Sequence, residues 1–267
     1  MYDYHTHSSW SCDGVADIDS MVSAAAAMGI TRIAITDHDD PLHPDSDLPT
    51  QIDLGGYTQA LTRAAARWNR PGSPVTLIRG IEIGMLIGES LDVAARDVSF
   101  YDFDFVIGSV HAAKGAYIDE QTYLGTRSYE AAVQDYYNGI IECLEAYSDF
   151  DVLGHINNID RYLDKIPGNE LFMHLADRVL VKLVELEKGL EVNTSSYRRG
   201  MGGRTTPTLE ILKRYRELGG ETVTIGSDAH RPKDVGRDLD KGIGLIKAAG
   251  FKYLAAFRNR KPDYIKL

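Results

Sequence analysis

The sequence has little cysteine and no long apolar segment. Its two cysteines, Cys12 and Cys143, stand far apart among 267 residues, so they do not suggest a disulfide scaffold, and neither belongs to a Cys-x-x-Cys motif. No apolar run approaches the ~20 residues that a transmembrane helix requires, and the opening residues do not resemble a signal peptide. We therefore predict a soluble, cytoplasmic protein with reduced thiols and no membrane partner.

Positive charge and nucleotide-binding motifs are scarce too. The chain has 29 lysines and arginines against 39 aspartates and glutamates, which gives a formal net charge of −10. A general nucleic-acid-binding protein usually carries a basic stripe, so nucleic acid is not expected as a partner. The lack of a Gly-x-Gly-x-x-Gly turn after the first predicted strand disfavours a dinucleotide-binding fold. The acidic excess either serves solubility or favours a site that attracts metal ions or a cationic substrate.

Short apolar runs alternate with longer helical patterns along the chain. The runs rich in Val, Ile and aromatic residues predict strands at residues 2–7, 31–36, 75–83, 103–110, 152–155, 190–194, 222–226 and 253–257. The patterns between them predict helices at 18–28, 57–68, 128–146, 171–188, 208–218 and 240–249. Such alternation implies parallel strands, and seven or eight repeats favour a closed α/β barrel. No linker is visible, so we predict one domain over residues 1–267.

Nearly every predicted strand ends in a residue that can bind a metal ion. Six of the eight histidines stand at these ends, together with three carboxylates; the residues concerned are His5, His7, Asp37, His38, Glu82, His111, His155, Asp228 and His230. A single histidine beside a strand is more often a packed or capping residue. Active sites of α/β barrels form where the C-terminal strand ends converge, so this distribution predicts a shared metal cluster.

The types of ligand indicate the chemistry. His5 and His7 are two residues apart on a strand and therefore project to one face, and Asp228 with His230 repeats this spacing. Mixed nitrogen and oxygen ligands suit zinc, iron or manganese. A metal-bound water loses a proton near neutral pH and becomes a strong nucleophile, and adjacent metals can hold phosphate oxygens. No serine-elbow or redox-cofactor motif competes with metal-dependent hydrolysis.

Six short motifs, in this order, resemble the PHP (polymerase and histidinol phosphatase) superfamily. They are His5-Thr6-His7, Thr36-Asp37-His38, Gly80-Ile81-Glu82, Gly108-Ser109-Val110-His111, Gly154-His155 and Ser227-Asp228-Ala229-His230. The resemblance runs from residue 2 to residues 257–262, and so covers essentially the whole chain. It implies a distorted (β/α)7 TIM-like barrel with two or three divalent metal ions (Zn, Mn or Fe) at the C-terminal ends of the strands.

The resemblance also implies which residues bind each ion. The first ion has the ligands His5, His7, Glu82 and Asp228, and the second shares Glu82 and adds His111 and His155. The third has Asp13, His38 and His230. Asp13 stands where many relatives have histidine, so its oxygen is expected to alter the affinity or the metal preference of the third site.

Within the superfamily, two further stretches resemble the monofunctional histidinol-phosphate phosphatases. The first leads from Gly154 to Arg161, and the second, residues 190–198, matches a Glu-x-Asn-Thr-Ser-Gly-x-Arg segment with Ser196 in place of glycine. In such enzymes two arginines bind the substrate phosphate. The matching residues are Arg161 and Arg198, with Arg199 as the alternative to Arg198. Arginine suits this role because it binds phosphate oxygens bidentately.

The prediction is a phosphomonoesterase that hydrolyses L-histidinol phosphate to L-histidinol and phosphate, in histidine biosynthesis, by attack of a metal-bound hydroxide. Asp228, His230 and His38 are the candidates for proton transfer to the leaving oxygen. His43, in the loop after the second strand, is a candidate contact for the cationic substrate, whereas Asp45 and Asp47 are better interpreted as a solvated acidic loop. The alternatives are a PHP phosphoesterase for another small phosphomonoester or a nucleotide, and a non-catalytic metal-binding module.

Overall fold

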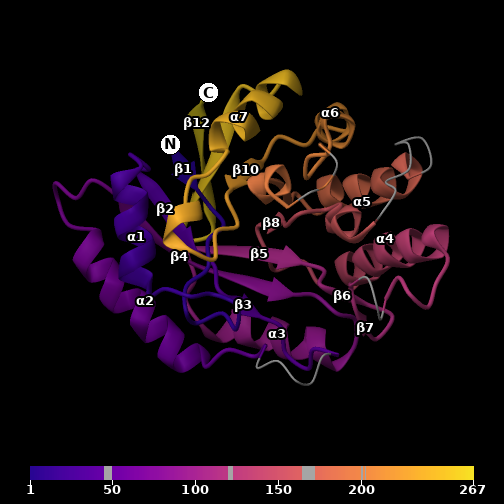
Figure 1. The fold of residues 1–267 in the computed structure, drawn as a ribbon, viewed down its shortest axis with the longest axis horizontal. Coiled ribbons are helices and arrows are strands. Elements are labelled where there is room, and N and C mark those ends of the chain that lie inside the picture. The colour runs from indigo at the N-terminus through magenta and orange to yellow at the C-terminus, as the bar shows by residue number, and fades with distance from the viewer. Residues whose placement is uncertain (45–49, 120–122, 164–171, 200, 202) are drawn as a thin grey trace.

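The computed structural model describes residues 1–267 except 45–49, 120–122, 164–171, 200 and 202. Among the described residues, seven parallel strands follow one another in the main sheet (Figure 1). In spatial order they are β1 (Tyr2–Asp3), β2 (Arg32–Ile35), β4 (Thr76–Gly84), β5 (Phe105–Ser109), β8 (Val152–Leu153), β9 (Gly189–Asn193) and β10 (Val223–Gly226). A short strand, β3 (His38–Asp39), also pairs with β4 beyond the end of β2.

The first and last of these strands meet, which nearly closes the sheet into a barrel. The Tyr4 amide donates to the Ile225 carbonyl (2.9 Å), the Asp228 amide donates to the His5 carbonyl (2.7 Å), and Thr6 forms a parallel bridge with Ala229. The distorted (β/α)7 barrel predicted from the sequence is therefore confirmed. The regular strand predicted over residues 2–7 is limited to β1, and the rest of that segment pairs through single hydrogen bonds.

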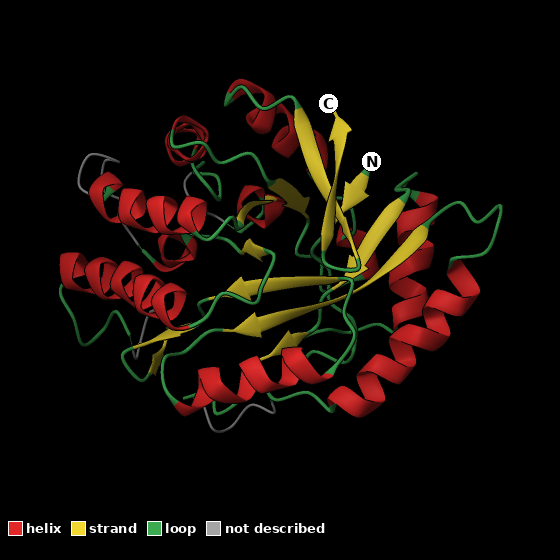
Figure 2. Ribbon diagram, turned by 180° about the vertical axis from the view of Figure 1, so that it is seen from behind, coloured by secondary structure: helices red, strands yellow, loops and turns green. Residues whose placement is uncertain are grey.

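A helix follows each of the seven strands and packs outside the barrel (Figure 2). These helices are α1 (Ile18–Ala27), α2 (Leu54–Trp68), α3 (Glu89–Phe100), α4 (Tyr129–Ala146), α5 (Met173–Glu185), α6 (Leu209–Glu217) and α7 (Leu239–Ala248). Their starts are encoded locally: the Asp17 carboxylate accepts from the Ser20 amide before α1, and Thr208 caps α6 through Ile211. No helix in the described part of the chain is long and apolar enough to cross a membrane.

The last predicted strand does not join the barrel wall. Residues 253–257 belong to β11 (Tyr253–Arg258), which pairs antiparallel with β12 (Lys261–Lys266). The strand predicted at these residues is confirmed, but it lies outside the seven-strand order, because β1 and β10 already pair with each other. Instead, Phe257 packs inside the barrel against Phe105 (ring centroids 5.1 Å apart), and Tyr4 donates to the Phe257 carbonyl. The hairpin thus closes one end of the barrel.

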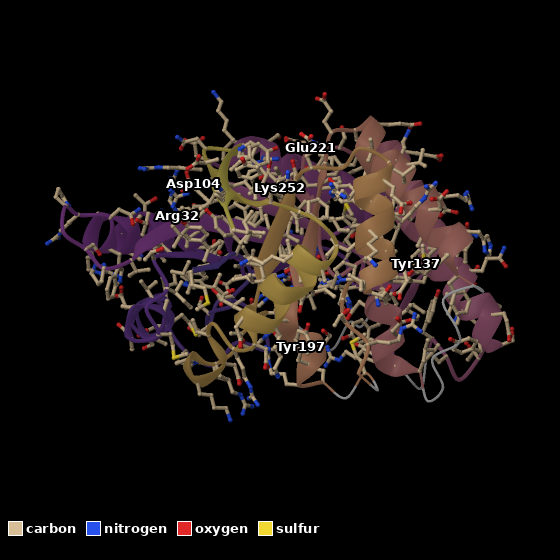
Figure 3. All side chains as sticks on the ribbon, turned by 90° about the horizontal axis from the view of Figure 1, so that it is seen from above. Arg32, Asp104, Tyr137, Tyr197, Glu221 and Lys252 are labelled. Carbon is tan, nitrogen blue, oxygen red and sulfur yellow. The ribbon has the colours of Figure 1, made fainter. Side chains whose placement is uncertain are left out.

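The two ends of the barrel are distinguished by the labelled side chains in Figure 3. Arg32, Asp104, Glu221 and Lys252, which stand at or just before the start of a strand, lie toward one side of the molecule, and Tyr197, which follows β9, lies toward the other. The strand ends that carry the predicted ligands therefore face away from the hairpin. This is the end at which α/β barrels build their active sites.

Candidate metal centre

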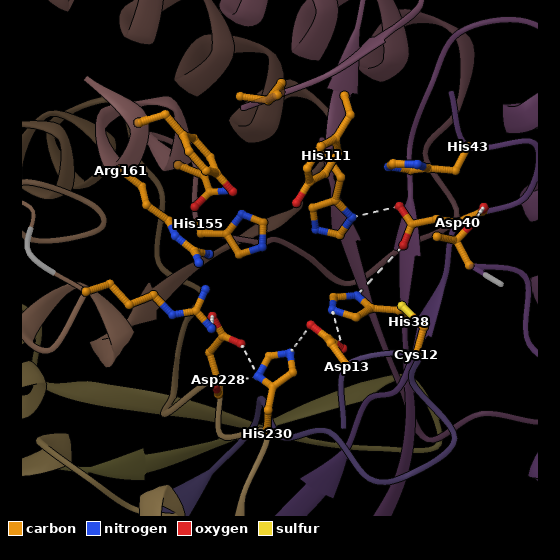
Figure 4. A pocket seen from close by; sticks show the side chains of 16 residues that line it. Cys12, Asp13, His38, Asp40, His43, His111, His155, Arg161, Asp228 and His230 are labelled. Carbon is orange, nitrogen blue, oxygen red and sulfur yellow. Dashed lines mark hydrogen bonds and ion pairs between the residues drawn. The ribbon is translucent and has the colours of Figure 1, made fainter. Parts of the chain in front are cut away.

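A cavity of about 250 Å³ opens at the C-terminal ends of the strands (Figure 4). The predicted ligands in its wall are Asp13, His38, His111, His155, Asp228 and His230. Arg161 stands on one side of the cavity, His43 and Asp40 stand on the other, and His111 lies between them. Residues separated by more than 200 positions thus meet here, as the strand-end pattern predicted.

Glu82, on β4, lies at the centre of the cluster and is completely buried. Its Oε1 is 2.9 Å from Nε2 of His155 and 3.4 Å from Nε2 of His111. Its Oε2 is 3.0 Å from Nε2 of His5 and 3.5 Å from Nε2 of His7. Each carboxylate oxygen therefore faces different histidines, which is the arrangement of a ligand that bridges two cations.

A third group lies beside this pair. Nε2 of His230 is 2.9 Å from Oδ2 of Asp13, and Nε2 of His38 is 3.9 Å from Oδ1 of the same carboxylate. Burial opposes ionisation of Asp13, but its close contact with His230 and the charge of His38 lower its pKa to about 2. The Nδ1 of His38 also lies 2.9 Å from Oε2 of Glu82. His38 therefore links the third group to the central carboxylate.

His7 offers the clearest test of whether the cluster fits a metal ion. The Ser11 hydroxyl donates to Asp37 (2.8 Å) and accepts from the His38 amide (3.0 Å), so Nδ1 of His7, 3.2 Å away, must donate to it. The lone pair of His7 is then on Nε2. This buried nitrogen lies 3.5 Å from Glu82 and 3.6 Å from an oxygen of Asp228, yet it makes no hydrogen bond.

A buried lone pair that faces two carboxylates is repelled by both unless a cation lies between them. Burial and the neighbouring histidines lower the pKa of His7 well below its usual range, so the ring does not supply that positive charge itself. The Asp228 carboxyl is charged: burial opposes this, but Arg199 and nearby histidines hold its pKa well below its usual range. The donor set of His7, Asp228 and Glu82 therefore fits a divalent ion.

Asp40 and Ser11 are among the residues of the site that were not predicted from the sequence. Asp40 lines the cavity, and its Oδ1 lies 2.7 Å from Nδ1 of His111. Burial opposes protonation of His111, but Asp40 and Glu82 raise its pKa well above its usual range. Ser11 holds His7 as described. The run from Asp37 to Asp40 after the second predicted strand was a signal for Asp40, whereas a lone serine carried none.

The structure separates the two adjacent arginines that the sequence left as alternatives. The described lining residues include Arg161 and Arg199 but not Arg198. Arg199 Nη2 is 3.5 Å from Oδ2 of Asp228. Arg198 instead donates to the backbone carbonyls of Ser227 (2.5 Å) and Asp228 (3.1 Å). Arg198 thus supports the backbone of a predicted ligand, and Arg199 presents a guanidinium group to the cavity.

The predicted substrate-contact residue in the loop after β3 also lies at the cavity. His43 is a lining residue, and its ring centroid is 4.9 Å from that of Tyr117 on the short strand β7 (Ala116–Tyr117). Asp45 and Asp47 lie outside the described residues. The cavity wall therefore combines the guanidinium groups of Arg161 and Arg199 with the carboxylate of Asp40 and the imidazole of His43, which lie opposite Arg161.

The fold and the cluster together define a class of protein. A parallel β/α barrel that gathers histidines and carboxylates around one buried glutamate, at the C-terminal ends of its strands, is a TIM-like barrel with a divalent-metal site.

The chain belongs to the PHP domain family, whose family model matches residues 3–195. It is 30% identical to a histidinol-phosphatase of Lactococcus lactis, over 98% of this chain and 96% of that one. It is 29% identical to a probable histidinol-phosphatase of Thermotoga maritima, over 96% and 95% of the two chains. The crystal structure of the histidinol phosphate phosphatase from Lactococcus lactis, complexed with zinc, L-histidinol and phosphate, superposes with a TM-score of 0.87 and 27% identity over 98% of both chains.

Proposed function

We propose that this protein is a metal-dependent phosphomonoesterase that hydrolyses L-histidinol phosphate to L-histidinol and phosphate. The observation that carries the proposal is the position of Glu82, whose two oxygens face separate histidine groups beside a cavity lined by two arginines. The full-length similarity to histidinol-phosphatases, one of them solved with zinc, L-histidinol and phosphate, supports the choice of substrate.

Two or three ions, of Zn, Mn or Fe, would be held by residues from six strand ends. His5, His7, Glu82 and Asp228 hold the first, Glu82 with His111 and His155 the second, and Asp13, His38 and His230 the third. Bound divalent ions supply Lewis acidity, which lowers the pKa of a coordinated water and offsets the charge of the phosphate. We also take residues 1–267 as one PHP-type barrel domain, because the first strand pairs with β10 and the C-terminal hairpin packs inside the barrel.

The remaining cavity residues act on the substrate itself. The guanidinium groups of Arg161 and Arg199 donate to phosphate oxygens, and these charge-assisted bonds orient the ester and exclude other poses. His43 contacts the cationic part of the substrate on the opposite side of the cavity. The leaving oxygen needs a proton, and the groups in the wall that can transfer it are Asp228, His230 and His38.

The direct test is a substrate panel. The purified protein is analysed for bound metals and assayed for phosphate release from L-histidinol phosphate beside nucleotides and other small phosphomonoesters. We expect hydrolysis of L-histidinol phosphate to exceed that of the other esters by at least tenfold in kcat/KM, about 1.4 kcal/mol of discrimination. Equal, weak rates across the panel would leave the family membership standing and remove the specific substrate.

The adjacent arginines give a matched pair of variants. Arg199→Ala is expected to lower kcat/KM by roughly 10- to 100-fold and to weaken inhibition by inorganic phosphate, because hydrogen bonds to charged groups contribute ~1.5–3 kcal/mol. Arg198→Ala is expected to reduce metal content, since it frees the backbone of Asp228. If Arg198→Ala weakens phosphate inhibition with its metals intact and Arg199→Ala does not, the assignment to Arg199 is wrong.

The third ion can be tested through Asp13. Asp13→Asn keeps the size of the side chain but removes its charge, so we expect this variant to lose the third ion and to keep the two that share Glu82. Asp17→Asn is the matched control: Asp17 caps α1 outside the cavity, and asparagine caps a helix equally well. Metal content per chain after gel filtration is the measurement. An unchanged metal content in Asp13→Asn contradicts the proposed ligand.

A further inference from the structure

Strand β9 supplies none of the proposed metal ligands, although it lies between two strands whose ends do. Its neighbours are β8, which leads to His155, and β10, which leads to Asp228. Glu191 and Asn193 are two residues apart on β9, so their side chains project to the same face. Both are 1% exposed. A buried carboxylate at this position needs partners, and its partners are the proposed ligands on other strands.

Glu191 contacts two of them, one proposed for each of the ions that share Glu82. Its Oε1 lies 2.5 Å from Nδ1 of His5, whose Nε2 faces Glu82. Its Oε2 accepts from the backbone amide of His155 at 2.9 Å. His155 has a positive φ of 22°, a backbone conformation that a residue with a side chain rarely adopts. One carboxylate thus touches the ring of the first histidine and the strained backbone of the second.

Gly226 leaves room for this carboxylate. A Cβ on Gly226 would lie 2.9 Å from Oε1 of Glu191 and 2.2 Å from Cβ of His5. On the other side, a Cβ on Gly154 would make ordinary contact with Oε2 of Glu191 at 3.6 Å, and that glycine leaves room instead for the Ser109 hydroxyl, 2.3 Å away. The carboxylate therefore occupies a fitted space between β8 and β10.

Asn193 extends the network to a third proposed ligand. Its Nδ2 lies 3.4 Å from each oxygen of Glu191 and 3.4 Å from Oδ2 of Asp228. Its Oδ1 accepts from the Ser195 amide, which fixes the orientation of the side-chain amide. The donor group of Asn193 is thereby directed between Glu191 and Asp228.

We propose that Glu191 is the positioning residue of the metal centre: from β9 it holds His5 and His155, two ligands that follow other strands. By accepting the Nδ1 proton of His5 it keeps the lone pair of that ring on Nε2, toward Glu82, and by accepting the His155 amide it holds the second histidine in its unusual conformation. Partners of this kind orient a ligating imidazole and raise its basicity. The inference rests on the ligand sets given under the proposed function.

Glutamine cannot replace Glu191 in this role. Both oxygens of the carboxylate accept a hydrogen bond, from His5 and from the His155 amide. A side-chain amide has one accepting oxygen and one donating nitrogen. If the nitrogen faces His5, the ring must move its proton to Nε2 and loses the lone pair that binds metal. If the nitrogen faces His155, two N–H groups oppose each other, so either orientation disturbs one ligand.

The experiment compares Glu191→Gln with a control variant in the full-length protein. Asp151→Asn is the control. Asp151 is also a buried carboxylate, and it accepts a hydrogen bond from the backbone amide of Val106. It precedes β8, however, and so lies at the other end of the barrel from the metal centre. Zn²⁺ affinity is measured by competition with a chromophoric chelator, Co²⁺-loaded protein is examined by its visible absorption spectrum, and thermal unfolding is followed in EDTA.

We expect Glu191→Gln to weaken Zn²⁺ binding by about 10–100-fold, the usual effect of losing an outer partner of a ligand, and to alter the Co²⁺ spectrum. Asp151→Asn should keep the wild-type affinity and spectrum whatever its unfolding temperature in EDTA. If Glu191→Gln keeps the Zn²⁺ affinity and the Co²⁺ spectrum of the wild type, the inference about Glu191 is wrong and the proposed function is unaffected. A wild-type protein that binds no Zn²⁺, Mn²⁺ or Fe²⁺ overturns both the inference and the proposed function.

Discussion

Replacement of Glu82 by alanine should remove phosphatase activity and leave the barrel folded. The expected loss in kcat/KM exceeds about 100-fold, because loss of an outer partner of a ligand already costs about 10–100-fold and Glu82 is proposed to bind two ions directly. Its oxygens lie between 2.9 and 3.5 Å from nitrogens of His5, His7, His38, His111 and His155. Without it, the two proposed cations lose a shared negative ligand, and the five histidines lose the carboxylate that they surround.

The measurement is kcat/KM for L-histidinol phosphate at saturating metal, with circular dichroism as the check on the fold. Glu82→Gln is the informative companion, since it keeps the shape of the side chain but offers one accepting oxygen in place of two. We expect this variant to bind fewer ions than the wild type. Full activity in a metal-replete Glu82→Ala protein would falsify the bridging role and with it the proposed mechanism.

Removal of the metals should abolish activity and lower the thermal stability of the protein. The cluster buries several carboxylates beside imidazoles, and bound cations offset the repulsion between these negative charges. A cation that binds only the folded state stabilises it by about 2.7 kcal/mol when its concentration is 100 times its Kd. For a protein of this size, each kcal/mol corresponds to roughly 2–4 °C in the unfolding temperature. We therefore expect a decrease of several degrees on chelation.

The measurement pairs an activity assay with differential scanning calorimetry, before and after dialysis against EDTA, followed by addition of Zn²⁺, Mn²⁺ or Fe²⁺ one at a time. The ion that restores both activity and unfolding temperature identifies the working metal. Glu82→Ala serves as the control, because its unfolding temperature should respond much less to chelation. Undiminished activity in protein shown to be free of metal would contradict the proposal.

The ligand positions could be predicted from the sequence because each is tied to a strand end. His5, His38, Glu82, His111 and His155 follow or end apolar runs, and strand ends in a parallel barrel converge whatever the intervening helices contain. The fold class followed from the same alternation. The helix α3 (Glu89–Phe100) was missed: the residue before it, Gly88, offers no side-chain cap that would mark its start.

The partners of the ligands could not be predicted in this way. Glu191 meets His5 across 186 positions of sequence, and Asp40 meets His111 across 71. Such contacts depend on the register of neighbouring strands and on the direction of side chains inside the barrel, which a sequence pattern does not specify. The same limit applied to Arg198 and Arg199, because adjacent residues at the end of a short helical turn point to different sides.

The hairpin of β11 and β12 closes the end of the barrel opposite the metal centre. Because Phe257 packs against Phe105 and accepts a hydrogen bond from Tyr4 at that end, molecules enter and leave through the cavity that Arg161, His43 and Tyr162 line. The phosphoryl group has to go in first to reach the proposed metal ligands that line the cavity, so we expect the alcohol to depart before inorganic phosphate can. We therefore expect the release of inorganic phosphate to limit kcat.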